Sequence, residues 1–470
     1  MVSTFETVDQ RGAATAVSLR RLTVGLCINV VAIAFETIAV ATAMPVAARD
    51  LNGLDYYAWT FSVFVIGMLF ATVVAGRLSD RIGPAKPLLV GMAIFVVGLL
   101  VAGSSTHMVQ LIGGRLVQGV GSGLINTAIF VCVAQAYSLT QRPRMFTYIS
   151  TAWVLPSFIG PPVSAWLTEQ LSWHWVFFAV VPLVVGGALL LLPMLRRMMA
   201  SFAPAAAESE STRPAPLWAA GLVAVAAAFL QLAGQRLDWV AIGLLVAGLA
   251  GLVAGLPQLM PACFNRFERG LPAVIVSRGL LAGAFVGGEA FVPLMLVEER
   301  KVALVLAGAA LTVGAVGWTT GSWLQSRRWL KIRRDRLITF GCVSLSLGLG
   351  ATGLVAFVPE LPFYLVAVGW IFSGLGMGLA TSSTSLAVMT LSEAAVQGRN
   401  GSSLNLSDAL GAGLFLGVSG TIFAGLHEVV DLSVTFGAVL GTMTVVAALA
   451  ALTSLRIGAV RNEFSAAAGS

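Results

Sequence analysis

Charged side chains are scarce in this sequence of 470 residues. They make up 10% of the chain, whereas hydrophobic residues make up 57%. An ordinary globular domain uses about 25% charged residues, most of them on its surface, and here the mean hydropathy is +0.90. The chain lacks the polar residues for a water-facing surface of normal size. This excludes a soluble fold and predicts an exterior that lies mostly in lipid.

Cysteine and histidine are also rare. The four cysteines are Cys27, Cys132, Cys263 and Cys342, and the three histidines are His107, His174 and His427. The cysteines show no paired spacing, which argues against a disulfide framework or a zinc site. The histidines fall in predicted outer loops without partner motifs, and no nucleotide-binding loop is present. The sequence therefore predicts no metal site, no cofactor, no enzyme and no ATP-driven pump.

Long apolar runs recur along the whole chain. A helix needs about 20 such residues to cross the roughly 30 Å of membrane hydrocarbon. Fourteen runs reach this length, which predicts an all-α integral membrane fold with 14 transmembrane helices. The runs are roughly 22–45, 58–76, 87–105, 109–136, 145–168, 174–195, 217–235, 239–258, 271–297, 302–324, 338–358, 362–390, 403–426 and 432–456.

Positive charge alternates between successive loops. With the N-terminus in the cytoplasm, the predicted cytoplasmic segments carry 22 of the 28 Lys and Arg residues. The predicted outer loops carry only Arg49, Arg236, Arg300 and Lys301. Cytoplasmic loops of membrane proteins are enriched in Lys and Arg, so both termini are expected inside. The net charge of +7 then reflects topology rather than nucleic-acid binding.

The order of the runs predicts two six-helix bundles related by pseudo-symmetry, with a two-helix hairpin inserted between them. Gly76-x-x-x-Asp80 after the second run is echoed by Gly321-x-x-x-Gln325 after the tenth, as a duplication would place them. The predicted parts are an N-terminal bundle (1–195), a cytoplasmic linker (196–216), the hairpin (217–258), a cytoplasmic loop (259–270) and a C-terminal bundle (271–470).

Four short motifs stand in or next to the first, second, fourth and fifth runs. They are Phe35-Glu36 with Val40 to Pro45, Gly76-x-x-x-Asp80-Arg81-x-Gly83, Leu111 to Gly119 around Arg115, and Gly160-Pro161-Pro162. Together they resemble the signatures of the major facilitator superfamily, in its fourteen-helix drug:proton antiporter branch of bacterial multidrug efflux type. The sequence departs from the usual pattern by having Glu36 in place of an aspartate.

The resemblance implies roles for two of these motifs. In the family, the loop of Gly76, Arg77, Asp80, Arg81 and Gly83 locks the outward-facing state through charge contacts between helices. The alternative is simple positive-inside topology, which leaves Asp80 unexplained. Gly160-Pro161-Pro162 would be a packing hinge that seals a proton leak, and the alternative is a tolerated helix kink. Such a protein is expected to be a monomer in the bacterial inner membrane.

Three acidic residues lie well inside apolar runs, namely Glu36, Glu289 and Asp408. An ionisable group in the membrane costs about 2.5–3.5 kcal/mol on insertion scales, so each is a functional candidate. Glu36 and Arg115 are predicted at depths that differ by only about 5 Å. A carboxylate beside a guanidinium holds its proton less tightly than one alone. The pair could therefore couple proton binding to transport, or be a static ion pair between two helices.

Glu289 is expected near the membrane midplane, where it could bind a cationic substrate or a second proton, or only a polar neighbour. Asp408 is expected a turn or two into its helix, where it could stabilise the helix dipole or, as the family resemblance implies, contribute to cation recognition. Arg278 is expected to extend to the inner interface. Trp153, Trp318 and Trp370 lie within runs and could face a substrate cavity, or pack against helices and lipid.

The leading hypothesis is a proton-coupled exporter of hydrophobic, cationic drugs or metabolites that works by alternating access. Its partners would be a small-molecule substrate and the lipid bilayer. Export of a lipid, glycolipid or endogenous metabolite is the alternative, although the short outer loop at 425–431 offers no long insertion for handing on such cargo. An integral-membrane enzyme is the least favoured function.

Overall fold

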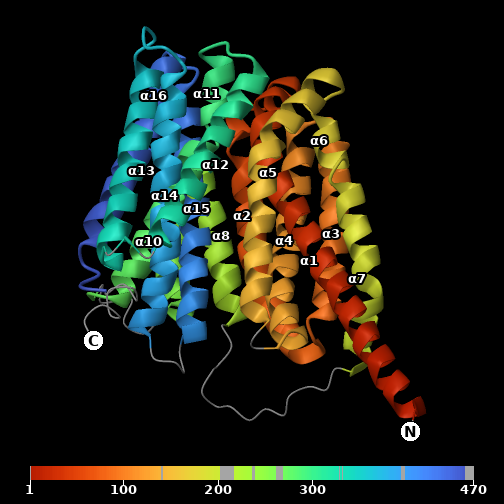
Figure 1. Ribbon diagram of the computed structural model, residues 1–470. Coiled ribbons are helices and arrows are strands. Elements are labelled where there is room, and N and C mark those ends of the chain that lie inside the picture. Colours follow the sequence, from red (N-terminus) through yellow and green to blue (C-terminus); the bar gives the residue numbers. More distant parts are fainter. Residues whose placement is uncertain are drawn as a thin grey trace.

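The computed structural model describes residues 2–138, 141–201, 216–234, 239–260, 268–327, 329–330, 332–392 and 397–460. The described chain is all-helical, as predicted (Figure 1). Its elements are α1 (Val2–Asp50), η1 (Leu54–Tyr56), α2 (Trp59–Ile82), α3 (Ala85–Gly103), α4 (Met108–Ala136), α5 (Arg142–Gln170), α6 (His174–Phe178), α7 (Val181–Ser201), α8 (Leu217–Gly234), α9 (Trp239–Leu259), α10 (Leu271–Glu289), α11 (Val292–Glu298), α12 (Leu304–Gln325), α13 (Arg334–Phe357), α14 (Leu365–Leu391), α15 (Gln397–Leu426) and α16 (Leu432–Ser454).

Thirteen stretches of the described chain are helical, long and apolar enough to cross a membrane. Three of them combine two helical elements, namely η1 with α2, α6 with α7, and α10 with α11. The proline-containing α5 is a further helix of 29 residues. Helices dominate because the lipid interior offers no water to the backbone, so each segment must satisfy its own N–H and C=O groups. The structure confirms the all-α membrane fold.

Helices pack mainly within two groups, α1 to α7 and α10 to α16. In the first group α2 and α3 pack against α4, and α1 packs against α5. In the second, α12 and α13 pack against α14, and α10 packs against α15. Figure 1 shows the groups side by side, with contacts of α2 with α15, α5 with α12 and α1 with α11 joining them. We call these groups the first and second halves.

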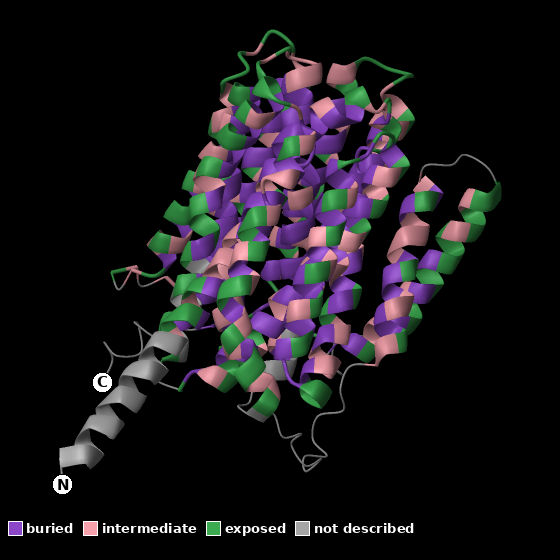
Figure 2. Ribbon diagram, turned by 90° about the vertical axis from the view of Figure 1, so that its right-hand side faces the viewer, coloured by how far each residue is buried: buried purple, intermediate pink, exposed green. Residues whose placement is uncertain are grey.

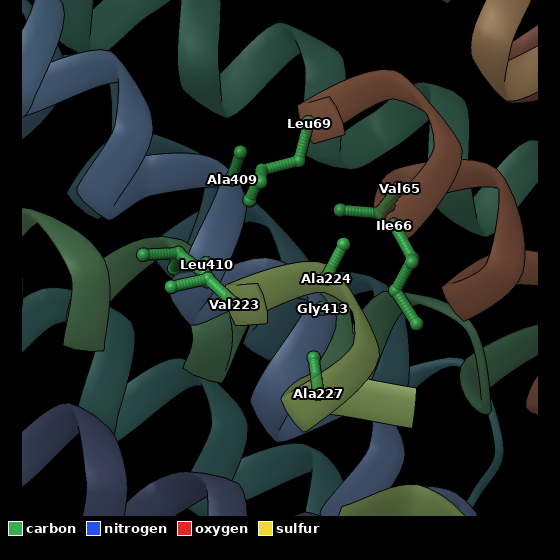
Figure 3. Close-up of a pocket in the computed structure, with 9 residues that line it drawn as sticks. All are labelled: Val65, Ile66, Leu69, Val223, Ala224, Ala227, Ala409, Leu410 and Gly413. Carbon is green, nitrogen blue, oxygen red and sulfur yellow. The ribbon is translucent and has the colours of Figure 1, made fainter. Parts of the chain in front are cut away.

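The helices α8 and α9 form a hairpin at one side of the molecule. α8 packs against α2 and α15, whereas α9 packs mainly against α8 (Figure 2). A small gap beside α8 has only aliphatic residues and a glycine around it (Figure 3). These are Val65, Ile66, Leu69, Val223, Ala224, Ala227, Ala409, Leu410 and Gly413. Because the gap offers a ligand no polar group, it belongs to the packing of the hairpin.

Several helices begin earlier than the apolar runs predict, and α1 and α15 differ most. α1 covers Val2–Asp50 instead of 22–45, and it continues through Pro45. α15 begins at Gln397 instead of 403, so Asp408 lies eleven residues into the helix, about three turns. The membrane-spanning stretch of α15 is Ser403–Leu426, so within this stretch Asp408 lies one to two turns deep, as predicted. A helix can extend beyond the lipid with polar residues, and a search for apolar runs does not detect that part.

Candidate functional site

Glu36 and Arg115 form an ion pair between α1 and α4. Their side chains are 0% and 2% exposed. The guanidinium of Arg115 also donates from Nη1 to Oε1 of Gln118 and from Nε to the backbone oxygen of Thr60. The donor–acceptor distance is 2.8 Å in both hydrogen bonds. It lies over the Phe64 ring at 4.4 Å from the centroid. Arg115 is thus held by three polar groups and an aromatic ring.

Glu36 is less fully bonded than its partner. Its Oε2 atom is buried and has no hydrogen-bond partner among the described residues, because Arg115 bonds to Oε1. A carboxylate oxygen with a free lone pair is a position that a proton can occupy. Removing either charge from a buried ion pair leaves the other uncompensated, which costs about 3–5 kcal/mol. The pair therefore has one buried acceptor, Glu36 Oε2, that Arg115 does not occupy.

The close approach of α4 to α2 depends on Gly119. A Cβ atom at this position would lie 2.1 Å from the backbone oxygen of Phe64, nearer than real atoms pack. The backbone oxygen of Thr60, which accepts from Arg115, lies one turn before Phe64 on α2. Gly119 thus allows the two helices to approach closely enough for Arg115 to reach this oxygen.

We expect Gly119→Ala to destabilise the protein by about 1–3 kcal/mol, because the added methyl group forces α2 and α4 apart. The measurement is the thermal unfolding midpoint in detergent. Gly113→Ala is the matched control, since it lies on the same helix with nothing within 4 Å of an added Cβ. Equal midpoints for the two variants would contradict the packing argument.

A second ion pair joins α10 and α15 in the second half. Arg278 bonds from Nε to Oδ1 of Asp408, and from Nη1 to the Thr381 backbone oxygen at 2.9 Å and Thr384 Oγ1 at 3.2 Å. The expected extension of Arg278 to the inner interface is therefore wrong. Asp408 does not stabilise a helix N-terminus, because α15 begins three turns earlier. The sequence offers no signal for this pair, whose members are 130 positions apart.

Three aromatic rings from α10, α12 and α14 form a cluster in the second half. Phe285 stacks on Trp370 at a centroid distance of 5.3 Å and meets Trp318 edge-on at 5.4 Å. Trp370 is fully buried, and its Nε1 has no hydrogen-bond partner among the described residues. Glu289, the last residue of α10, follows Phe285 by four positions and therefore lies on the same helix face. Phe285 is absent from the sequence-based candidates, because a phenylalanine in an apolar run is unremarkable.

Two other predicted site residues, Glu289 and Trp153, are absent from these ring contacts. No hydrogen bond or ion pair of the Glu289 carboxylate is found within the described residues. Glu289 is the last residue of α10, and a short turn separates it from α11. It therefore lies where the membrane helix is interrupted. Trp153 on α5 is 39% exposed and takes no part in the ring contacts around Phe285.

The predicted gating loop lies at the end of α2, where Asp80 and Arg81 are exposed. In the described part of the chain Asp80 forms no ion pair. Gly83 ends α2 with a φ of 77°, a backbone conformation that favours glycine. Gly76 and Arg77 are adjacent and lie between one and two turns before the helix end at Ile82. The spaced glycines thus include one with a clear conformational requirement.

The predicted hinge lies between the halves. α5 continues as a helix through Gly160, Pro161 and Pro162. Pro161 packs on α12, where a Cβ added to Gly308 would lie 3.2 Å from Pro161. Two residues after the motif, the Ser164 hydroxyl donates to the Ala39 backbone oxygen of α1 at 2.6 Å. The motif therefore lies where α1, α5 and α12 meet.

The two halves are joined at the end of the bundle where α1 finishes, which we call the Asp50 end. Arg49 forms an ion pair with Glu298. The Tyr57 hydroxyl donates to the Ala290 backbone oxygen at 2.6 Å. Beside them, burial raises the pKa of Glu299 to about 7, although the neighbouring Arg300 lowers it. These contacts hold the halves together at the Asp50 end.

Comparison with known proteins places this geometry in a family. The family model of the Major Facilitator Superfamily matches residues 26–415. Multidrug resistance protein 3 of Bacillus subtilis is 25% identical over 419 residues, covering 86% of this chain and 80% of that protein. The multidrug efflux pump SdrM of Staphylococcus aureus is 22% identical over 413 residues, covering 83% of this chain and 87% of the pump.

Solved structures resemble the fold. A crystal structure of a POT family transporter in complex with a thioalcohol-conjugated peptide superposes with a TM-score of 0.69 at 15% identity. The match covers 94% of this chain and 96% of that chain. At this identity the likeness concerns the fold alone.

The match to the family model spans most of the chain, and the two bacterial relatives described above are transporters. The chain therefore belongs to the Major Facilitator Superfamily.

Proposed function

We propose that this protein is a proton-coupled exporter of hydrophobic, cationic drugs or metabolites that works by alternating access. The multidrug names of two relatives support the substrate class. The observation that carries the proposal is the buried Glu36–Arg115 pair with its unpartnered Glu36 Oε2. A proton on Glu36 would cancel its attraction for Arg115, and deprotonation would restore it.

The second part of the proposal concerns the moving parts. The first half (1–195) and the second half (271–470) would rock against one another around a central substrate site, with the hairpin 217–258 attached to one side. Contacts between the halves at the Asp50 end and the absence of an Asp80 ion pair within the described residues favour an inward-facing state. In this assignment the Asp50 end faces outward and both termini lie in the cytoplasm of a bacterial inner-membrane monomer.

The third part of the proposal places the substrate beside Glu289. A carboxylate attracts a cation into a low-dielectric site, where the attraction is strong. The rings of Phe285, Trp318 and Trp370 add apolar surface and can contribute cation–π attraction of about 0.5–2 kcal/mol. Asp408 is 36% exposed while paired, so it offers a further negative group in the second half.

Proton coupling is tested by measuring proton movement directly. Purified protein is reconstituted into liposomes that contain a pH-sensitive dye, and the cation tetraphenylphosphonium is added as a gradient. We expect the substrate gradient to drive protons in the opposite direction, at a rate that saturates with substrate. A proton signal equal to that of empty liposomes, with transport of tetraphenylphosphonium intact, would exclude antiport.

Glu289→Gln is expected to lower the transport of tetraphenylphosphonium by about tenfold while neutral chloramphenicol is moved at the normal rate. The amide removes the negative charge and keeps the shape, so only the charge-dependent part of recognition is lost. The measurement is the KM for each compound in the same liposomes. Glu360→Gln, on an exposed loop at the Asp50 end, is the matched control. Equal losses for both compounds would show that Glu289 does not select charge.

A further inference from the structure

Three side chains that commonly bind metals meet at the Asp50 end. Asp55 lies in η1, between α1 and α2, whereas His427 and Glu428 follow α15. One ligand atom from each lies within 4.8 Å of the other two. The side chain of His427 is 10% exposed and that of Asp55 is 61% exposed. An ion can thus reach the group from solvent, while the imidazole is held in place by its surroundings.

The hydrogen bonds of His427 determine which of its nitrogens faces the two carboxylates. Nδ1 lies 3.1 Å from the backbone oxygen of Phe423 and 3.3 Å from that of Ala424. A carbonyl oxygen can only accept, so the hydrogen is on Nδ1. In a neutral imidazole this leaves a lone pair on Nε2. Histidines that bind a metal through one ring nitrogen usually donate a hydrogen bond from the other nitrogen to a carbonyl or carboxylate oxygen.

The second ring nitrogen, Nε2, faces a carboxylate oxygen of the first half. Nε2 of His427 lies 3.1 Å from Oδ1 of Asp55, which carries only lone pairs when ionised. Either a proton on Nε2 or a metal cation between the two atoms can join them, and a metal ion would take the place of that proton. Atoms that bind one tetrahedral zinc ion at about 2.0–2.2 Å are about 3.3 Å from one another, close to this spacing. The exposed carboxylate of Glu428 can supply the third bond.

The ligand types favour one class of metal. Imidazole together with carboxylates suits zinc and similar divalent transition metals, whereas magnesium and calcium prefer oxygen ligands alone. With three protein ligands, water would fill the fourth position of a tetrahedral ion.

A chain of aromatic rings joins this group to the contact between the halves. The ring centroid of Tyr57, in the first half, lies 5.4 Å from that of Phe291. The centroid of Phe291 lies 5.4 Å from that of Phe423. Phe423 is buried and stacks on the His427 ring at 4.9 Å. His427 is therefore positioned from the second half, directly opposite Asp55 of the first half. An ion bound by both would bridge two parts that must separate during alternating access.

We propose that Asp55, His427 and Glu428 bind a divalent transition metal such as Zn²⁺, which holds the Asp50 ends of the two halves together and slows transport. The sequence predicts no metal site because Asp55 and His427 are distant in the chain and carry no motif. The proposal does not depend on proton coupling at Glu36. It would make the exporter sensitive to metal ions on the side of the membrane that the Asp50 end faces.

Binding is tested by isothermal titration calorimetry of ZnCl₂ into the purified full-length protein in detergent at neutral pH. We expect one site per chain with a micromolar dissociation constant, weakened by at least about tenfold in His427→Ala and in Asp55→Asn. His107→Ala is the matched control, because His107 is another loop histidine, outside this group. Unchanged affinity in His427→Ala, or no binding by the wild type, would overturn the proposal.

The effect on gating is tested in liposomes with ZnCl₂ in both compartments, so that the orientation of the protein does not matter. We expect zinc to slow the exchange of tetraphenylphosphonium by at least about tenfold, EDTA to restore it, and His427→Ala to be resistant. MgCl₂ at the same concentration should have no effect. Full exchange at saturating zinc would disprove the bridging role, even if calorimetry shows binding. Because exchange needs no proton gradient, this result is independent of the antiport proposal.

Discussion

Glu36→Gln should reduce substrate efflux driven by a pH gradient to the level of empty liposomes. The glutamine has nearly the same shape, but it can neither release a proton nor carry the charge that holds Arg115. Arg115 would keep its bonds to Gln118 and to the Thr60 backbone oxygen, so the helices should remain packed. The loss should therefore concern coupling rather than folding. The measurement is the initial rate of efflux of tetraphenylphosphonium under an imposed pH gradient.

Two controls separate coupling from general damage. Glu36→Gln should still exchange labelled for unlabelled substrate across the membrane, because exchange requires no net proton movement. Glu169→Gln, at the exposed end of α5, makes the same chemical change away from the pair and should behave as the wild type. If Glu36→Gln retained gradient-driven efflux at the normal rate, the proton would have to bind elsewhere, and Glu289 would be the next candidate.

Arg115→Gln should destabilise the protein by about 3–5 kcal/mol, because it leaves the buried Glu36 without its countercharge. Adding Glu36→Gln to this variant should restore most of the loss, since no buried charge then remains. The measurement is a double-mutant cycle of unfolding free energies in detergent, with all four proteins at one pH. Effects in contact pairs are not additive, whereas those of independent sites add within about 0.5 kcal/mol.

The exposed Arg49–Glu298 pair is the control for this cycle. Arg49 is 54% exposed, and solvent-exposed pairs contribute only about 0–1 kcal/mol. Arg49→Gln should therefore have a small effect on stability. If the Glu36 and Arg115 changes added without coupling, the two charges would be independent in the protein. Arg115 could then not report the protonation of Glu36, and the proposed mechanism would lose its basis.

Much of the fold could be predicted because the bilayer acts on each segment separately. A run of about 20 apolar residues forms a helix wherever it stands in the chain, since no other structure satisfies its backbone in lipid. For the same reason a charge inside a run is conspicuous, which identified Glu36, Arg115, Glu289 and Asp408. Helix ends were predicted less well, because α1 and α15 extend through polar residues that the apolar runs exclude.

The partners of these charges could not be predicted from spacing along one helix. Depth in the membrane follows from sequence position, but the direction in which a side chain points relative to other helices does not. Arg278 therefore forms an ion pair with Asp408 instead of extending to the membrane interface. Phe285 joined Trp318 and Trp370 without any distinguishing pattern of its own.

The sequence by itself determined the membrane-spanning, all-helical fold and the short set of membrane-embedded charges. The reason is that the free energy of placing a side chain in lipid depends mainly on the type of that residue. The tertiary structure alone decided which of those charges pair, that Glu36 keeps one free oxygen, and that His427 faces Asp55 across the two halves. These contacts join helices far apart in the chain, and they arise only when packing between helices sets their rotation and distance.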